Sequence, residues 1–391
     1  MAWTIDSTLI PRIFGAAFQV LREACPLLRD VSKDYEDAAG SVGDTLTIPY
    51  AAAGTTAAVT PSNATPNGAD LTPGKTSITL TSHRGTAPFK ILETDAWKMN
   101  MSGFIPKVID EQVRALANYI NTQLWAAYPA VYGYAGTAGT KPFATNTNPV
   151  ADVEGVLWAQ GCRGANRKLY VGGSDYTQAL KLSDLKSASS AGDAKALRQG
   201  FIGNLFGLDT WRDSGRTAHV AGTITKGLAA KANTAVAAGL KTLVATTADD
   251  TGACALKVGD IISIAGQKQG TFVLTADATQ AEAAKDVTLT FEPALDKALA
   301  GGEAITVKAS HDVNLAGDPQ GLILVIRRAQ PSMGLPGMEP QGDPITVLDP
   351  ETSIPLTLWR YRQYHQSTLE FTVGPFGCGV GDARFLARLA G

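Results

Sequence analysis

The segment Asn67–Thr81, NGADLTPGKTSITLT, decides between two classes of fold. Its centre, Pro73-Gly74-Lys75-Thr76, resembles the end of a phosphate-binding loop, G-x-x-x-x-G-K-[ST], which would predict a nucleotide-binding α/β protein. The position of the first glycine of that motif is occupied by Ala69, and polar and apolar residues alternate from Thr76 to Thr81. Alternation with period two predicts a strand, whereas a phosphate loop must be followed by a helix. The segment therefore predicts a turn followed by a β-strand.

A second alternating segment lies upstream of this strand. In TLTIPY, the apolar residues Leu46, Ile48 and Tyr50 are expected on one face of a strand. The intervening residues 51–74 are small residues and turn formers without periodicity, and they lack the apolar side chains that a core needs. We therefore predict an extended hairpin over residues 41–92, whose tip gains order by lying on another surface.

Two helical patterns flank the hairpin. Residues 11–28 carry one apolar stripe, which is expected either in the core or on a projecting arm that docks on a neighbour; both readings stay open at this point. Its members are Phe14, Phe18, Leu21, Cys25 and Leu28. Residues 104–127 carry a longer stripe, which predicts a spine helix of roughly 35 Å. Its members are Ile105, Ile109, Val113, Leu116, Ile120 and Leu124.

The rest of the chain divides into three parts by pattern. Residues 148–217 alternate helical and strand patterns, with helices expected over 153–159 and 177–182 and strands over 168–172 and 207–211. Residues 218–310 consist of short β-prone segments between turns, which predict a small antiparallel barrel or sandwich. Longer apolar strands return at 322–326 and 356–361, on either side of a Pro/Gly-rich loop at 329–344. We therefore expect an α/β body that is interrupted by an all-β insertion.

Composition narrows the classes of function. The chain has 391 residues, 34 Lys+Arg and 36 Asp+Glu, and its net charge of −2 argues against a surface built for tight nucleic-acid binding. Charged residues make up 18% of the chain, below the usual ~25%, so we expect partners to cover much of the surface. No signal peptide and no membrane span are predicted, and a cytoplasmic origin fits.

The sequence offers no assembled active site. The four cysteines are widely scattered, and none of the four histidines has a second histidine or cysteine at a spacing that would place two metal ligands on one face. Cys162 is expected to be a buried thiol rather than a nucleophile activated by Arg163, because no general base can be identified for it. The dipeptide His311-Asp312 is expected to make a loop hydrogen bond. No catalytic residue, cofactor or metal is predicted.

Two glycine motifs also resemble enzyme signatures. Gly172–Tyr176 approaches the nucleophile elbow G-x-S-x-G, but Tyr176 would crowd the strand–helix crossing, so Ser174 or Asp175 is predicted to cap a helix. Gly377–Gly381 resembles a dinucleotide loop, yet too few residues follow it for the βαβ unit that such a loop serves.

The order of these elements is similar to that of a known family. Arm helix, long hairpin, spine helix, α/β region and terminal strands resemble the major capsid proteins of tailed bacteriophages, which have the Hong Kong 97-like fold. The segments 256–266, 271–276 and 287–291 look like the extra inserted domain of short-tailed-phage coat proteins, and 201–208 is similar to the segment that precedes that insertion. The fold implied is α+β with an inserted all-β, barrel-like domain.

The resemblance also implies an organisation and a set of contacts. It divides the chain into an arm (1–40), an extended hairpin loop (41–92), a peripheral domain with the spine (93–147), the first part of an axial domain (148–217), an inserted β domain (218–310) and the axial and peripheral strands (311–391). The residues it implies at contacts between subunits are Phe14, Phe18, Leu21, Tyr50, Lys75, Arg84 and Lys90. No lysine–asparagine pair can be singled out as a covalent crosslink.

The function implied is structural. Hexamers and pentamers of the chain would close an icosahedral shell, assembled as a precursor in the host cytoplasm and expanded as double-stranded DNA enters. The implied partners are scaffolding, portal and decoration proteins, together with nonspecific contacts to the packaged DNA. One alternative is an encapsulin-type compartment shell, which shares the fold; another is a hydrolase or carbohydrate-binding protein with a β module.

Overall fold

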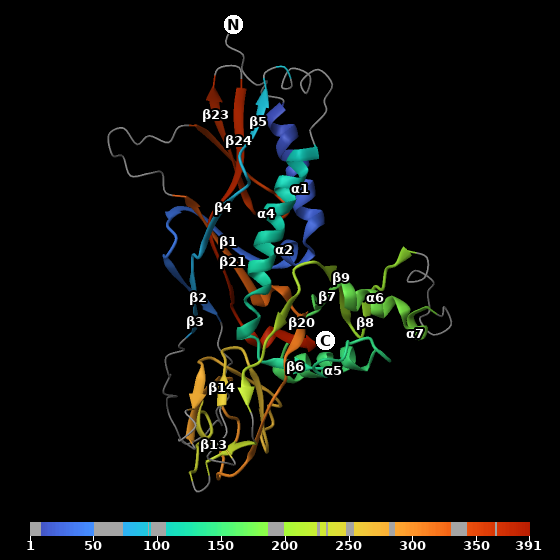
Figure 1. Cartoon of the computed structure of the whole chain (residues 1–391), viewed down its shortest axis with the longest axis vertical. Coiled ribbons are helices and arrows are strands. Elements are labelled where there is room, and N and C mark those ends of the chain that lie inside the picture. Colours follow the sequence, from blue (N-terminus) through green and yellow to red (C-terminus); the bar gives the residue numbers. More distant parts are fainter. Residues whose placement is uncertain are drawn as a thin grey trace, which may run out of the picture.

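The chain has an elongated α+β fold with a small barrel at one end (Figure 1). The computed structural model describes residues 9–50, 73–92, 94, 107–186, 199–224, 227–231, 234–247, 254–280, 286–329, 342–363 and 366–391. The predicted hairpin tip, most of the Pro/Gly-rich loop and His365 lie outside these residues. No helix in this described part is long and apolar enough to cross a membrane.

The body of the subunit is a seven-stranded sheet with the strand order β1-β21-β24-β23-β22, in which β4 and β5 also pair with β24. Strand β1 runs parallel to β21, and the other pairs are antiparallel. The strands are β1 (Ser32–Gly40), β4 (Ser82–Gly85), β5 (Phe89–Leu92), β21 (Leu322–Ala329), β22 (Asp343–Leu348), β23 (Pro355–Gln363) and β24 (Gln366–Val380).

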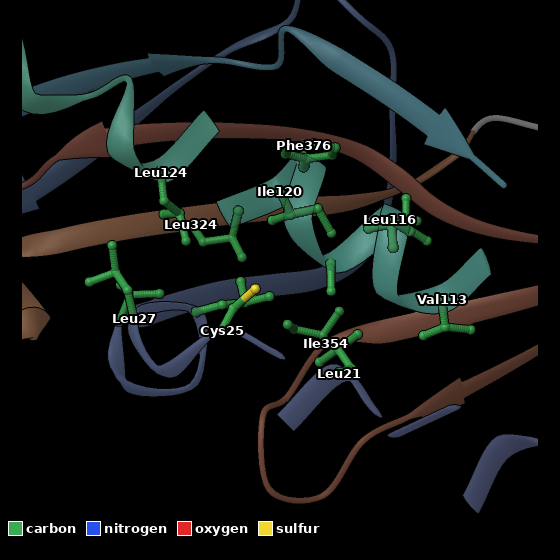
Figure 2. Packing of buried hydrophobic residues seen from close by; sticks show 14 of the residues in the cluster. Leu21, Cys25, Leu27, Val113, Leu116, Ile120, Leu124, Leu324, Ile354 and Phe376 are labelled. Atoms are coloured by element: carbon green, nitrogen blue, oxygen red, sulfur yellow. The ribbon is translucent and has the colours of Figure 1, made fainter. Parts of the chain in front are cut away.

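Three helices pack on this sheet: α1 (Leu9–Ala24), α2 (Pro26–Asp30) and α4 (Lys107–Trp125). Helix α4 confirms the predicted spine, although Ile105 lies outside the described residues. Its apolar stripe is buried between α1 and the sheet, where Ile120 lies near Leu324 and Phe376 (Figure 2). The long helix is therefore held by tertiary packing along one face, which is the usual source of helix stability in proteins.

The single helix predicted over residues 11–28 is observed as two. Helix α1 ends at Ala24, Cys25 adopts an extended conformation with φ −141° and ψ 93°, and α2 begins at Pro26. A proline disfavours the helical conformation of the residue before it and suits the first turn of a helix. Pro26 therefore ends one helix and begins the next.

A second sheet of seven strands forms the α/β region, with the order β6-β25-β20-β7-β9-β8 and with β10 paired to β20. Helices α5 (Asn148–Gln160) and α6 (Gly173–Lys181) contribute to its apolar core, and α7 (Ser183–Lys186) follows α6. The strands are β6 (Gly133–Ala135), β7 (Lys168–Gly172), β8 (Asn204–Leu205), β9 (Leu208–Asp213), β10 (Thr217–His219), β20 (His311–Gly317) and β25 (Leu386–Ala390). Short 3-10 turns lie at η1 (Tyr128–Ala130), η2 (Pro319–Gly321) and η3 (Ala383–Phe385). The predicted strand 168–172 is confirmed at both ends.

The insertion contains a closed barrel of strand order β12-β13-β18-β16-β15-β19, with a three-stranded sheet β11-β14-β17 beside it. The prediction of a small antiparallel barrel is confirmed, since every strand pair of this unit is antiparallel. The strands are β11 (Thr223–Ile224), β12 (Leu228–Ala230), β13 (Thr242–Thr247), β14 (Cys254–Leu256), β15 (Ile261–Ile264), β16 (Phe272–Leu274), β17 (Ala278–Gln280), β18 (Asp286–Glu292) and β19 (Ala304–Val307).

The barrel has an apolar core of its own, separate from that of the body, built around Phe272, Leu289 and Phe291. The chain enters this unit after β10 and leaves it into β20, and these two strands pair with one another. Entry and exit therefore lie side by side, which is the arrangement that lets an insertion leave the host fold intact.

Candidate assembly surface

The hairpin consists of β2 (Thr45–Tyr50) and β3 (Gly74–Thr79), which pair only with each other among the described strands. Their antiparallel register runs from Thr45 opposite Thr79 to Tyr50 opposite Gly74, so the two predicted strands and their pairing are confirmed. The hydroxyl oxygens of Thr45 and Thr79 lie 3.1 Å apart on the exposed face. One face of the hairpin is therefore polar, beginning at the end next to the body.

The base of the hairpin is anchored to the body by apolar contacts. Ile78 and Leu80 are 3% and 0% exposed, and they form a small cluster with Val325 of β21. Leu46 and Ile48 pack at the edge of this cluster and are only half-buried. Burial therefore decreases from the base of the hairpin towards its tip.

Two glycines of β24 let the hairpin approach closely. A Cβ atom on Gly377 would lie 2.3 Å from the carbonyl oxygen of Thr79, and one on Gly379 would lie 2.9 Å from Cγ1 of Ile78. The hydroxyl of Thr76 donates a hydrogen bond of 3.1 Å to the carbonyl oxygen of Gly381. Most of the glycine-rich segment that resembles a dinucleotide loop is thus part of β24, and β3 lies against it.

The four contact residues predicted within residues 41–92 lie on four different strands. Lys75 is exposed on β3, and the ring of half-buried Tyr50 covers Gly74, where a Cβ atom would lie 2.3 Å from Cζ of the ring. Lys90 is exposed on β5. Arg84 is exposed on β4, and its guanidinium carbon lies 4.8 Å from the centre of the Tyr119 ring. All four residues are accessible enough to meet a partner.

The other three predicted contact residues lie in the core of this chain. Phe14, Phe18 and Leu21 are 2%, 8% and 1% exposed, and they belong to the main core of the same subunit. The ring of Phe14 meets that of Phe371 edge-on at 6.2 Å, which ties α1 to β24. A neighbouring subunit could reach these side chains only if α1 left its own body, so the structure favours the core-helix reading for this stripe.

The surroundings of Cys162, the residue considered as a nucleophile, do not favour a reactive thiolate. Cys162 is 1% exposed, and burial raises the pKa of its thiol, which disfavours the reactive thiolate. The guanidinium of Arg163 lies 5.1 Å from the centre of the Trp158 ring. The expectation of a buried thiol is therefore confirmed.

The prediction that Ser174 or Asp175 caps a helix is wrong. Helix α6 starts at Gly173 with Gly172 as its N-cap, and no side chain caps it. Asp175 is completely buried, where it accepts hydrogen bonds of 2.9 Å from Arg216 and 3.0 Å from Asn314. It joins α6 to β20 through Asn314, and it forms an ion pair with Arg216, which lies between β9 and β10.

His311 is also placed differently from the prediction, because it begins β20 and is 4% exposed instead of lying in an open loop. Its Nδ1 does make a local hydrogen bond of 2.8 Å to the carbonyl oxygen of Ala309. In the described ranges, no group of three or more His, Cys, Asp or Glu residues could hold a metal ion.

A buried polar cluster between the body and the barrel escaped prediction altogether. Its members come from five separate parts of the chain, so no local motif announces them: Tyr128, His219, Asp260, His311 and Arg388. Arg388 is completely buried; its guanidinium donates to the carbonyl oxygens of Gly259 at 2.8 Å and Pro129 at 3.2 Å. Burial lowers its pKa to about 9.

Comparison with known proteins gives likenesses of structure alone. No protein-family model and no curated protein matches the chain. The chain is similar to the capsid structure of the cyanophage P-SCSP1u, with a TM-score of 0.42 and 9% identity over 91% of this chain and 85% of that one. It is similar to the mature capsid of bacteriophage PhiM1, with a TM-score of 0.41 and 12% identity over 91% and 84%. The capsid of a native GTA particle gives a TM-score of 0.40 and 12% identity over 93% and 89%.

Proposed function

We propose that this chain is the major capsid protein of a phage-type particle, a structural subunit that assembles into an icosahedral shell around double-stranded DNA. The observation that supports the proposal most directly is the hairpin. It leaves the body as two strands that pair only with each other among the described strands, and apolar contacts bury only its base. Such a ribbon is suited to lie on a neighbouring subunit.

The physical argument is one of stability. An isolated two-stranded hairpin is at best marginally stable in water, because it buries little apolar surface. Leu46, Ile48 and Tyr50 remain half-buried along one face of β2, and residues 51–72 supply few large apolar side chains. Contact with a second copy of the chain would bury that face. In a closed shell every subunit both gives and receives such a contact, and assembly stabilises the ordered hairpin by mass action.

The charge of the chain is compatible with this role. A net charge of −2 over 391 residues lets many copies pack closely without strong mutual repulsion. The finer parts of the proposal are hexamers and pentamers, assembly as a precursor in the host cytoplasm, and contacts with scaffolding, portal and decoration proteins. Contacts with the packaged DNA would be weak and nonspecific, since Lys and Arg do not outnumber Asp and Glu.

Electron microscopy of the purified full chain tests the proposal. We expect closed shells tens of nanometres across, formed by the chain alone or with a scaffolding protein. A protein that stays monomeric at high concentration in both conditions would contradict a shell-forming role.

A deletion tests the hairpin itself. Removing residues 54–72 and joining the ends with two glycines should leave a subunit with the circular dichroism and thermal unfolding of the full chain, because the anchored base is retained. Shell formation should fail or give particles that dissociate. Shells of normal stability would show that the hairpin does not join subunits.

A matched pair of charge reversals sharpens this test. Lys75→Glu changes an exposed side chain on β3, whereas Lys268→Glu changes an exposed side chain on the barrel. Both variants should fold like the parent. We expect Lys75→Glu to lower the yield of shells at least several-fold, whereas Lys268→Glu should not.

A further inference from the structure

The neck that joins the barrel to the body contains two buried histidines. His219 ends β10 and His311 begins β20, and the two residues are direct partners in the antiparallel pairing of these strands. The centres of their rings lie 5.3 Å apart, and the two residues are 3% and 4% exposed. The chain therefore enters the inserted domain at His219 and leaves it at His311, and these two residues face each other.

His219 links the barrel to the connection after α4. Its Nε2 lies 2.8 Å from Oδ1 of Asp260, and its Nδ1 lies 3.0 Å from the hydroxyl oxygen of Tyr128. Asp260 also accepts hydrogen bonds from the backbone N–H groups of Lys257, at 2.8 Å, and Gly222, at 3.1 Å. A neutral ring satisfies this arrangement when Nε2–H donates to the carboxylate and Nδ1 accepts from the tyrosine.

The surroundings of His311 fix one tautomer of its neutral ring. The carbonyl oxygen of Ala309 can only accept, so Nδ1 carries the proton and Nε2 is unprotonated in the neutral ring. This buried Nε2 has no hydrogen-bond partner among the described residues. A second proton would place a cation on His311 in a buried site, where the described residues offer Nε2 no acceptor.

The charged groups around the pair add to this cost. Arg388 of β25 reaches the barrel loop from the body side, and Lys308, just before β20, lies with its Nζ 5.7 Å from the centre of the Tyr134 ring. On the acidic side, Asp260 already accepts from His219 and two backbone N–H groups, and Asp312 pairs with Arg216 at 2.9 Å. The neighbourhood therefore holds one fixed cation at its centre and no uncommitted carboxylate among these groups.

We propose that His311, packed against His219 across the neck, is a proton-sensitive latch, which holds the barrel in its orientation on the body while the His311 ring is neutral and releases the neck when that ring takes a second proton. The released state keeps both the barrel and the body folded, because each has its own apolar core. Only the junction loosens. The latch belongs to the single subunit and does not require the shell.

The direction of the pH effect follows from His311. Burial lowers the pKa of His311 to about 4, and the positive charge of Arg388 and the neighbouring His219 act in the same direction. In an open neck the ring would have the ordinary pKa of ~6.5. The open form therefore binds more protons between these values, so the latch is complete above about pH 6.5 and is lost as the pH falls towards 4.

Hydrogen exchange of the full-length, unassembled subunit tests the latch. Rates at pH 7.5 and pH 4.5, corrected for the intrinsic effect of pH, are compared for peptides of the neck, residues 217–224 and 306–313. We expect opening of the neck to increase on the order of 50-fold at pH 4.5, from the two pKa values of His311. Protection of β13 and β18 inside the barrel should change little.

A histidine substitution supplies the control. In His311→Asn the side-chain amide keeps a donor near Nδ1 for Ala309 but cannot be protonated, so the acid response should largely disappear. His83→Asn removes an exposed histidine on β4 and should leave the response unchanged. Equal responses in the parent chain and in His311→Asn, or no response in the parent, would refute the latch.

A measurement on the parent chain covers the case in which His311→Asn does not fold. With 15N-labelled histidine, nuclear magnetic resonance gives the titration of each ring in the full chain. We expect His311 to titrate below about pH 5. A titration of His311 near pH 6.5 would exclude the latch.

Discussion

Gly377 and Gly379 in β24 set the distance between the hairpin and the body. A strand interior normally gains stability from side chains, and a glycine there marks a bulge or a close approach of another backbone. Here the close approach is that of β3, whose Thr79 carbonyl occupies the space that a side chain on Gly377 would need. The position of the hairpin thus depends on two missing Cβ atoms.

The substitution Gly377→Ala tests this dependence. The added methyl would meet a backbone oxygen at 2.3 Å, and a backbone cannot turn aside as a flexible side chain can. We expect a loss of about 1–3 kcal/mol in the free energy of unfolding, typical of overpacking, measured by urea denaturation. Hydrogen exchange of residues 74–80 should rise as well.

Gly270→Ala is the matched control, because nothing lies within 4 Å of a Cβ atom at that position. It should change stability by less than about 0.5 kcal/mol. If Gly377→Ala also left the free energy of unfolding unchanged, the position of the hairpin on the body would not depend on this glycine.

For single residues, the sequence predicts local patterns but not contacts between distant parts of the chain. The alternation around Ile78 predicts which face of β3 is apolar, because period two is a local property. Nothing near Arg388 predicts that its guanidinium meets the carbonyl oxygens of Gly259 and Pro129, since burial of a charge depends on elements far away in the chain. The His219–His311 pair escaped notice for the same reason: their adjacency comes from strand pairing across the whole insertion.

At the scale of elements, α1 packs as a core helix of this chain. Leu21 is 1% exposed in the cluster that includes Ile354 and Val113 (Figure 2). Periodicity correctly predicts the apolar stripe of this helix, but an apolar stripe has the same appearance whether it is buried in its own subunit or in a neighbour. Only the tertiary contacts separate the two readings.

Truncation of Leu21 tests that conclusion in the unassembled subunit. Leu21→Ala should lower the free energy of unfolding by about 2–5 kcal/mol, through lost burial and the cavity left behind. Chemical denaturation of the monomer provides the measurement. If the variant were as stable as the parent chain before assembly and weaker only within shells, α1 would be an arm after all.

Glu111→Ala on α4 is a suitable reference for this truncation. The side chain of Glu111 is 73% exposed, and its ion pair with Arg114 is a surface pair. Its removal should change stability by no more than about 0.5 kcal/mol.

Elements with a long, uninterrupted hydrophobic pattern are predictable from the sequence, whereas elements that are interrupted by turns are not. The spine and the strand 168–172 have long or uninterrupted patterns, and both are observed. An extended hairpin is predicted over residues 41–92, but the part of the chain that follows its tip divides into β3, β4 and β5. The division lets β4 and β5 pair with β24 while β3 stays with β2, a choice that depends on long-range pairing.

At the scale of the whole molecule, the barrel is a nearly independent unit. It has a closed set of strands, its own core, and a neck of two paired strands. A smaller apolar cluster, which includes Tyr132 and Ile261, also joins it to the body. We therefore expect the barrel to fold by itself, whereas the neck and this cluster fix its orientation.

Expression of residues 218–310 alone tests the first half of that statement. The fragment should unfold cooperatively in urea with the far-UV circular dichroism of a β protein, because closure leaves the barrel strands without free edges. A fragment without a cooperative transition would mean that the barrel needs the body in order to fold.

The place of β25 has a consequence for the order in which the protein can be made. Residues 386–390 form a strand between β6 and β20, although they follow both of them in the sequence. During synthesis on the ribosome, β6 and β20 emerge while the space between them is still unfilled, and the Arg388 anchor for the barrel loop is also missing. A chain that has been translated only as far as residue 385 therefore cannot complete this sheet. A half-made subunit would be kept out of any assembly that requires the finished sheet.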